Sequence, residues 1–128
     1  MKLHHTDSAP AAIGPYSQAI SCDGWLYTSG QVAIDPATGE MVPGDFAAQA
    51  EQVLANLSAV LSSAGCRPEN IVKATIYLSD MGNFGRLNEL YADFMGEHRP
   101  ARSTVQAARL PKDALVEIDL VARIPEAR

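Results

Sequence analysis

The longest regular pattern of hydrophobic positions lies between residues 46 and 64. Apolar side chains recur there every three or four residues, a spacing that places them on one face of an α-helix. Asp45 stands in the N-cap position, and Gly65 follows where a left-handed residue commonly ends a helix. The pattern predicts an amphipathic helix with this apolar stripe: Phe46, Ala50, Val53, Leu54, Leu57, Val60, Leu61 and Ala64.

A second stripe with helical spacing lies between residues 84 and 95. Asn83 precedes it as a candidate N-cap, and Gly96 is expected to end it. Asn88 lies on the flank of this stripe, where a buried amide would need a hydrogen-bonding partner. The stripe itself consists of Phe84, Leu87, Leu90, Tyr91, Phe94 and Met95.

Short runs of β-branched and apolar residues predict strands before the first helix. The runs at 17–22 and 25–29 flank Asp23-Gly24, a dipeptide typical of a tight hairpin turn. The segment 31–34 is expected to continue as extended chain. The proline and glycine of 35–40 then predict a turn before the first helix.

Three more strands are predicted at Ile71–Leu78, 103–107 and 115–124. In the last one hydrophobic and polar residues alternate, so one face can pack on helices while the other is partly polar. The order ββ(β)αβαββ predicts an α+β fold, in which one mixed sheet carries both helices on one face. The other face includes Val121, and an open face of this size favours an oligomer.

Size and composition restrict the possible classes. The 128 residues predict a single domain, residues 1–128, and 47% hydrophobic with 20% charged residues fits a soluble globular protein. A net charge of −5 without a basic cluster argues against a nucleic-acid partner. No apolar run reaches membrane-spanning length, and the N-terminus lacks an apolar signal core, so no membrane association and a cytoplasmic location are expected.

The sequence offers little support for a metal or a cofactor. His4, His5 and His98 do not have the spacing of a metal site, and no glycine-rich loop precedes a helix. Cys22 and Cys66 lie far apart and are interpreted as free thiols in a reducing compartment.

Arg102 and Glu117 are the residues that suggest chemistry. A guanidinium matches a carboxylate in two places, and a glutamate that faces the same cavity could orient or deprotonate a water molecule. Judged by residue type alone, a solvated arginine and an acid on the exposed face of a strand are the commoner interpretations. Another possibility is a surface ion pair of Arg102 with Asp119 or Glu117.

Several ordered motifs change this balance. The run Pro100-Ala101-Arg102-Ser103-x-Val105-x-x-Ala108-x-Leu110, followed by Val116-Glu117-Ile118, resembles the signature of the RidA/YjgF family, the reactive intermediate deaminases. Three other stretches agree: Ala12–Ala19, Thr28–Gln31 and Ile71–Thr75. The resemblance extends from about Ala9 to about Ile124, and several motifs at compatible spacing are much more specific than one.

The resemblance implies a chorismate-mutase-like fold and a homotrimer around a central barrel, with sites in the clefts between subunits. It implies hydrolysis of 2-aminoacrylate-type enamines through their imines, 2-iminopropanoate and 2-iminobutanoate, to 2-oxo acids and ammonia, without metal or cofactor. Arg102 would anchor the substrate carboxylate, and Glu117 would position the water. The other implied substrate-binding positions are Tyr16, Ser29, Gly30 (through its backbone), Asn88 and Thr104.

Two departures from the family bear on specificity. Many members have a cysteine where this chain has Thr104, so thiol chemistry is not expected at that position. The segment 97–100 is shorter than in many relatives and borders the cleft. Two alternatives stay open: a non-catalytic protein that binds small carboxylates or 2-oxo acids, and a ribonuclease or translation inhibitor, which would need a basic surface.

Overall fold

A computed structural model describes residues 1–126 of the chain. Three short 3₁₀ turns, Pro68–Asn70, Met81–Asn83 and Pro111–Asp113, connect its main elements. In chain order these elements are β1 (Lys2–His4), β2 (Ala19–Cys22), β3 (Trp25–Thr28), α1 (Phe46–Ser63), β4 (Ile71–Leu78), α2 (Phe84–Met95), β5 (Ala101–Gln106) and β6 (Val116–Arg123).

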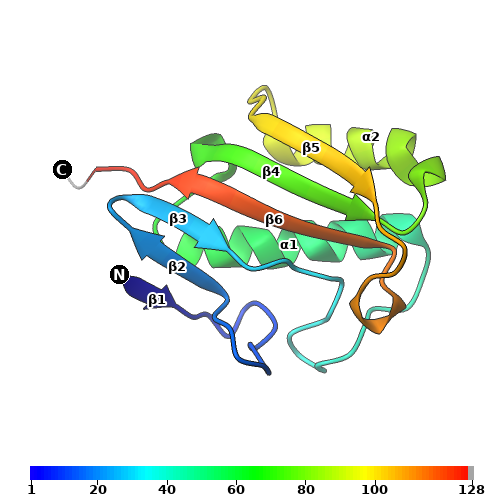
Figure 1. Cartoon of the computed structure of the whole chain (residues 1–128), viewed down its shortest axis with the longest axis horizontal. Helices are drawn as coiled ribbons and strands as arrows, with labels where there is room; N and C mark the ends of the chain where they lie inside the picture. The colour runs from blue at the N-terminus through cyan, green and yellow to red at the C-terminus, as the bar shows by residue number, and fades with distance from the viewer. Residues whose placement is uncertain (127–128) are drawn as a thin grey trace.

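The six strands form one mixed sheet in the order β1-β2-β3-β6-β4-β5. Neighbouring strands are antiparallel except β4 and β5, which are parallel. Both helices lie on the same face of this sheet (Figure 1). The predicted α+β architecture, with one mixed sheet and helices on one face, is therefore confirmed.

The core lies between the helices and this face of the sheet. On β6 the residues Val116, Ile118, Leu120 and Ala122 are buried, while the residues between them are more exposed, as the alternation predicts. The Asp45 side chain accepts a hydrogen bond from the Ala48 N–H, which confirms the predicted N-cap of α1.

The predicted cap of α2 was only partly right. Asn83 occupies the N-cap position, but its side chain makes no capping hydrogen bond. Asp80 instead accepts from the Gly82 N–H in the 3₁₀ turn that leads into the helix. Because the chain enters α2 from that turn, its first cap lies three residues earlier than the sequence pattern indicates.

The hairpin prediction is confirmed by the pairing of Cys22 with Trp25. Asp23 and Gly24 both have positive φ, 52° and 84°, as a two-residue turn of this kind requires. The expected extended segment 31–34 does not form a strand and makes only isolated bridges. The Asn56 amide donates to the carbonyls of Val32 and Ile34 and so uses acceptors that a strand partner would need.

The face of the sheet opposite the helices carries a row of apolar side chains. Leu3 pairs with Ile20, Ile20 with Tyr27, and Tyr27 with Val121, so the row crosses four strands at one level. Leu3 is 67% exposed and Tyr27 50% exposed. Paired residues on neighbouring strands point to the same face, so these four side chains form one patch, called the open-face row below.

None of the helices within residues 1–126 combines the length and the apolar character needed to cross a bilayer.

Candidate functional site

Glu117 lies in a cavity of 540 Å³ on one side of the molecule. Tyr16 comes from the loop before β2, and Ser29 and Gly30 from the segment that follows β3. Most of the remaining lining is apolar. The structure thus brings together four of the residues singled out in the sequence: Glu117, Tyr16, Ser29 and Gly30.

The main chain at Gly30 lies close to the carboxylate of Glu117. A Cβ atom built on Gly30 would overlap Oε2 of Glu117 and would lie 2.8 Å from its Cδ. A larger residue at position 30 would require the Glu117 carboxylate to move from this position. Ser29 is oriented separately, because its hydroxyl donates to the Ser17 carbonyl at 2.6 Å.

The electrostatic surroundings of Glu117 favour its neutral form more than water does. Burial raises the pKa of Glu117, and the charge of Asp119 raises it further. Asp119 lies two residues away on the same face of β6, and burial also raises its own pKa. A carboxyl group with a raised pKa is better matched to accepting and returning a proton near neutral pH.

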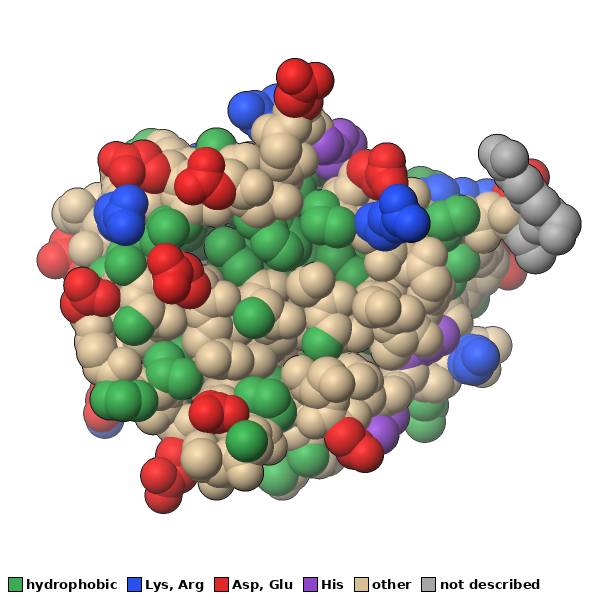
Figure 2. Space-filling view, turned by 180° about the vertical axis from the view of Figure 1, so that it is seen from behind, with side chains coloured by type: hydrophobic (Ala, Val, Ile, Leu, Met, Phe, Trp, Pro, Cys, Tyr) green, Lys and Arg blue, Asp and Glu red, His purple; other side chains and the backbone are tan. Residues whose placement is uncertain are grey.

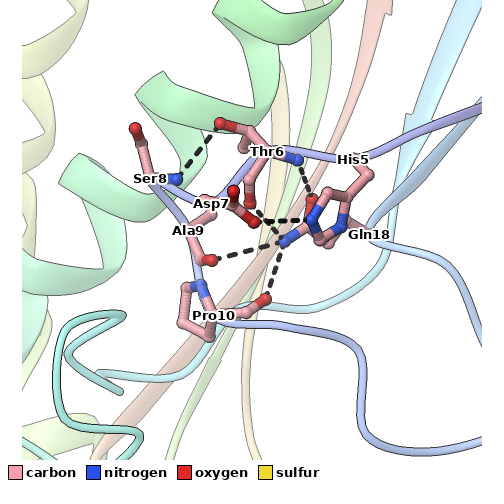
Figure 3. A network of polar contacts seen from close by, with 7 residues as sticks. All are labelled: His5, Thr6, Asp7, Ser8, Ala9, Pro10 and Gln18. Atoms are coloured by element: carbon pink, nitrogen blue, oxygen red, sulfur yellow. Dashed lines mark hydrogen bonds and ion pairs between the residues drawn. The ribbon is translucent and has the colours of Figure 1, made fainter.

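The loop that carries Tyr16 is held by a buried glutamine that sequence reasoning did not single out (Figure 3). The Gln18 amide accepts from the Thr6 N–H and donates to the carbonyls of Thr6, Ala9 and Pro10. Pro10 lines the cavity of Glu117, so Gln18 fixes one wall of that cavity. Nothing in its sequence neighbours indicates this role, because all its partners are backbone groups.

Lys112 is a second residue that lines the cavity and that no sequence motif indicated. It has φ 55° and ψ 26°, and Asp113 also has a positive φ of 55°. Two consecutive non-glycine residues in this region are unusual and carry backbone strain. The turn Pro111–Asp113 thereby places a cationic residue on the lining of the cavity that contains Glu117.

Arg102 occupies a different pocket, of 350 Å³, which α2 and the start of β5 form. Its Cζ lies 4.9 Å from the centre of the Tyr91 ring and 5.6 Å from that of Phe84. Asn88, also predicted as a site residue, lines the same pocket. The alternative considered for Arg102, a surface ion pair with Glu117 or Asp119, is absent within residues 1–126.

Three buried oxygen atoms on this side of the sheet lack a hydrogen-bonding partner within the described chain. They are Oδ1 of Asn88, Oη of Tyr91 and Oγ1 of Thr104. Burial raises the pKa of Tyr91, against the lowering effect of Arg102 and Arg99, so the phenol keeps its proton at neutral pH. Buried polar atoms are rarely left unpaired in proteins, so the Arg102 pocket, which Asn88 and Tyr91 line, is suited to a polar ligand or partner.

Arg102 and Glu117 lie on opposite faces of the same sheet. Arg102 pairs with Ala74, which is buried under the helices, and its side chain contacts α2. Glu117 pairs with Tyr77 on the face without helices. The expectation that both residues face one cavity is therefore not met within a single chain, because the sheet separates them.

No group of three or more His, Cys, Asp or Glu side chains among residues 1–126 is arranged to hold a metal ion. The histidines are engaged elsewhere: His4 with the Ser21 hydroxyl, His5 with Asp7, and His98 with the Ile71 carbonyl.

Comparison with known proteins identifies the family. Residues 6–124 match the family described as Endoribonuclease L-PSP, which is the RidA/YjgF family. A RutC family protein from Synechocystis is 52% identical over 127 residues, 98% of each chain. The chain belongs to the RidA/YjgF family.

Other RidA/YjgF relatives have names that refer to activity or ligand. The 2-iminobutanoate/2-iminopropanoate deaminase of Mus musculus is 47% identical over 121 residues, 94% of this chain and 90% of the mouse protein. E. coli TdcF with bound serine superposes with a TM-score of 0.91 at 41% identity, covering 96% of this chain and 98% of TdcF. A Rid family protein from Yersinia pestis gives a TM-score of 0.93 at 48% identity, covering 96% and 98% of the two chains.

Proposed function

We propose that this protein hydrolyses 2-imino acids, such as 2-iminopropanoate and 2-iminobutanoate, to 2-oxo acids and ammonia at sites shared between subunits. The observation that carries the proposal is the separation of Arg102 and Glu117 by the sheet. Each residue lies in its own pocket: one pocket supplies the arginine that would bind the carboxylate, and the other supplies the glutamate that would act on the water. A second copy of the chain, with its Arg102 pocket against the Glu117 cavity, completes the site.

The open-face row supports an assembly of copies. Its side chains cover four strands and leave large apolar groups in water in a single chain. Burying them against equivalent rows releases ordered water and stabilises an oligomer. A closed homotrimer places the open faces toward a common axis and repeats one contact around the ring.

In this site the Arg102 guanidinium binds the substrate carboxylate through paired hydrogen bonds. Glu117 of the neighbouring subunit accepts a proton from a water molecule as its oxygen attacks the imine carbon. The imine nitrogen takes up that proton, which gives a tetrahedral intermediate with one hydroxyl and one amino group. The hydroxyl proton then passes to the nitrogen as the carbon–nitrogen bond breaks, so the oxygen remains as the ketone and the nitrogen leaves as ammonia. One imine and one water give one 2-oxo acid and one ammonia, and positioning with one base suffices.

The relatives support this assignment. The mouse relative is named for deamination of the two imino acids, and TdcF was crystallised with serine. Serine carries a carboxylate next to an amino-bearing carbon, the same arrangement as the proposed substrates. The arginine anchor and the glutamate are both present in this chain.

Subunit mixing tests the proposal directly. Arg102→Ala and Glu117→Gln should each lower ammonia release from freshly generated 2-iminopropanoate by about a hundredfold or more. When equal amounts of the two variants are unfolded together and reassembled, activity should return. One site in about four then receives both native residues from different chains, so about a quarter of the wild-type rate is expected.

The double variant Arg102→Ala, Glu117→Gln, mixed with either single variant, is the control and should remain inactive. Absence of recovery in the mixed single variants, with assembly intact by sedimentation, would show that the site lies within one chain. Full activity of Arg102→Ala alone would remove the anchor from the mechanism.

The non-catalytic alternative makes a different prediction for Glu117→Gln. A binding protein needs no residue that positions water. It would bind pyruvate but would release no ammonia from an imine. The proposed enzyme loses turnover in this variant while pyruvate affinity is kept or improved, since the lost carboxylate repelled the anion.

The family description as an endoribonuclease motivates one further comparison. The net charge is −5, and on the helix side Lys and Arg side chains are scattered among Asp and Glu (Figure 2). RNA affinity depends on basic contacts to phosphate and falls steeply with salt. Salt-dependent binding of single-stranded RNA, with cleavage lost in Arg102→Ala, would favour the ribonuclease instead.

A further inference from the structure

The helix α2 presents three side chains in one line toward the strand that carries Arg102. Phe84, Asn88 and Tyr91 are spaced by four and three residues, so they lie on one face of the helix. The Arg102 Cζ lies 5.6 Å from the centre of the Phe84 ring and 4.9 Å from that of the Tyr91 ring. At separations below about 6 Å an aromatic ring attracts a cation. Asn88 lies between them in the same pocket.

The Arg102 guanidinium contacts aromatic rings, and none of its N–H groups donates a hydrogen bond to an acidic side chain within residues 1–126. Arg86, Arg99, Arg109 and Arg123 each donate to a protein oxygen, whereas Arg102 has neither an ion pair nor a side-chain hydrogen bond within residues 1–126. An aromatic ring attracts the positive charge through its electron-rich face. All N–H groups of Arg102 therefore stay available for a ligand.

Burial makes this arrangement rigid. Tyr91 is only 7% exposed and belongs to the hydrophobic core, and Phe84 packs against the same core. Arginine on a free surface samples many rotamers, and binding a ligand would have to restrict them. A ring fixed in the core restricts the guanidinium before the ligand arrives.

We propose that Phe84 and Tyr91 are positioning residues: they form an aromatic clamp that holds the Arg102 guanidinium in place for the carboxylate of the substrate. The substrate part of this inference rests on the proposed function. The orientation part does not, because it concerns Arg102 and its neighbours alone. The ring of Tyr91 carries the effect, and its hydroxyl is dispensable for it.

Binding and side-chain dynamics test the clamp together. In Tyr91→Leu the affinity for pyruvate, measured by calorimetry, should fall about fivefold, with kcat changed less than KM. The NMR order parameter of the Arg102 Nε–H should fall in the same variant. Tyr91→Phe keeps the ring and should keep the wild-type order parameter. Comparing the pyruvate affinity of Tyr91→Leu with that of Tyr91→Phe separates the effect of the ring from that of the hydroxyl.

Three further variants separate positioning from general packing. Phe84→Leu changes the second, partly buried ring and should weaken binding in the same direction, which keeps the test valid if Tyr91→Leu does not fold. Leu90→Ala perturbs α2 at a position outside the lining of the Arg102 pocket and should leave pyruvate affinity unchanged. In an Arg102→Ala background, Tyr91→Leu should cause no additional loss of pyruvate affinity.

The outcomes distinguish this inference from the proposed function. If Arg102 stays rigid in Tyr91→Leu and Phe84→Leu, or if Tyr91→Leu weakens binding equally with and without Arg102, the clamp is wrong. If the wild type releases no ammonia but the order parameter of Arg102 falls in both ring variants, the proposed function fails and the clamp stands.

Discussion

At the scale of single residues, the pair formed by Glu117 and Asp119 is the most informative feature. The two carboxyl groups lie two positions apart on one face of β6, and each has a pKa raised chiefly by burial. Asp119 adds its charge to the effect on Glu117. Asp119 thus influences the proposed catalytic group without belonging to the lining of its cavity.

Asp119→Asn should shift the acid limb of the pH profile of kcat/KM to lower pH. Removing the neighbouring negative charge lowers the pKa of Glu117, so its basic form persists in more acidic solution. The profile is measured as 2-oxo acid release across the carboxyl range. Asp93→Asn, an exposed change on α2, should leave the limb where it is.

The substitution Asp119→Asn should also change the free energy of unfolding in a pH-dependent way. A carboxyl with a raised pKa favours folding in its protonated form, so its contribution is present below the ordinary pKa of about 4 and is lost as pH rises through the raised value. Asp119→Asn should therefore increase the free energy of unfolding at pH 7, and this gain should shrink as pH falls toward 4. A gain independent of pH would contradict the assignment.

The sequence indicated Arg102 and Glu117 as the chemically important residues, but not their relation. Alternation along β6 predicts that Glu117 points away from Val116 and Ile118, and this is correct. The strand of Arg102 has no buried residue in its pattern, so no hydrophobic alternation reveals which face its side chain occupies. The pairing with Ala74 and the contacts with Phe84 and Tyr91 of α2 show it.

At the scale of elements, the loop before β2 depends on one side chain. Gln18 ties Thr6, Ala9 and Pro10 together through backbone groups, and this holds the lining of the Glu117 cavity (Figure 3). A buried glutamine with all these bonds is costly to remove, because the carbonyls it serves are left without donors.

Gln18→Ala should lower the free energy of unfolding by about 1–3 kcal/mol. It should also raise KM more than it lowers kcat, since the cavity wall loses its fixed position while Glu117 is untouched. Asn70→Ala removes another amide that holds a turn, by bonding the Arg67 N–H, and serves as the control. A similar rise in KM in the control would mean that general destabilisation explains the effect.

Helices and strands were predicted correctly from the sequence where a local pattern determines them. Helical periodicity and Asp45 located α1, and the β-branched run located β4 with its observed bounds. The segment 31–34 makes bridges at its two ends but no regular strand, and the amide of Asn56, more than twenty residues away, binds the carbonyls of Val32 and Ile34. The strand β1 was missed because three residues at a terminus carry too short a pattern.

At the scale of the whole molecule, the open-face row is the feature whose exposure would differ between a single chain and an assembly. Leu3 and Tyr27 are exposed and Ile20 and Val121 are half-buried within the described chain, whereas the opposite face is buried under two helices. The sequence indicated this imbalance through the count of helices. It could not indicate the number of copies, which depends on the fit between surfaces.

Tyr27→Glu should shift the protein toward monomers in sedimentation at micromolar concentration, because a charge in an apolar contact loses its hydration. Ammonia release should fall by about tenfold or more with it. Ser58→Glu adds the same charge on the exposed side of α1 and should change neither property. A monomeric Tyr27→Glu protein with wild-type activity would refute a site shared between subunits.

The placement of Arg102 and Glu117 on opposite faces also bears on how concentration controls this protein. If no chain holds a complete site, specific activity falls on dilution once subunits dissociate, as mass action requires. By linkage, a 2-oxo acid that bridges two chains favours their association as strongly as association favours its binding. The accumulating product would then hold the subunits together in cells that make little of the protein.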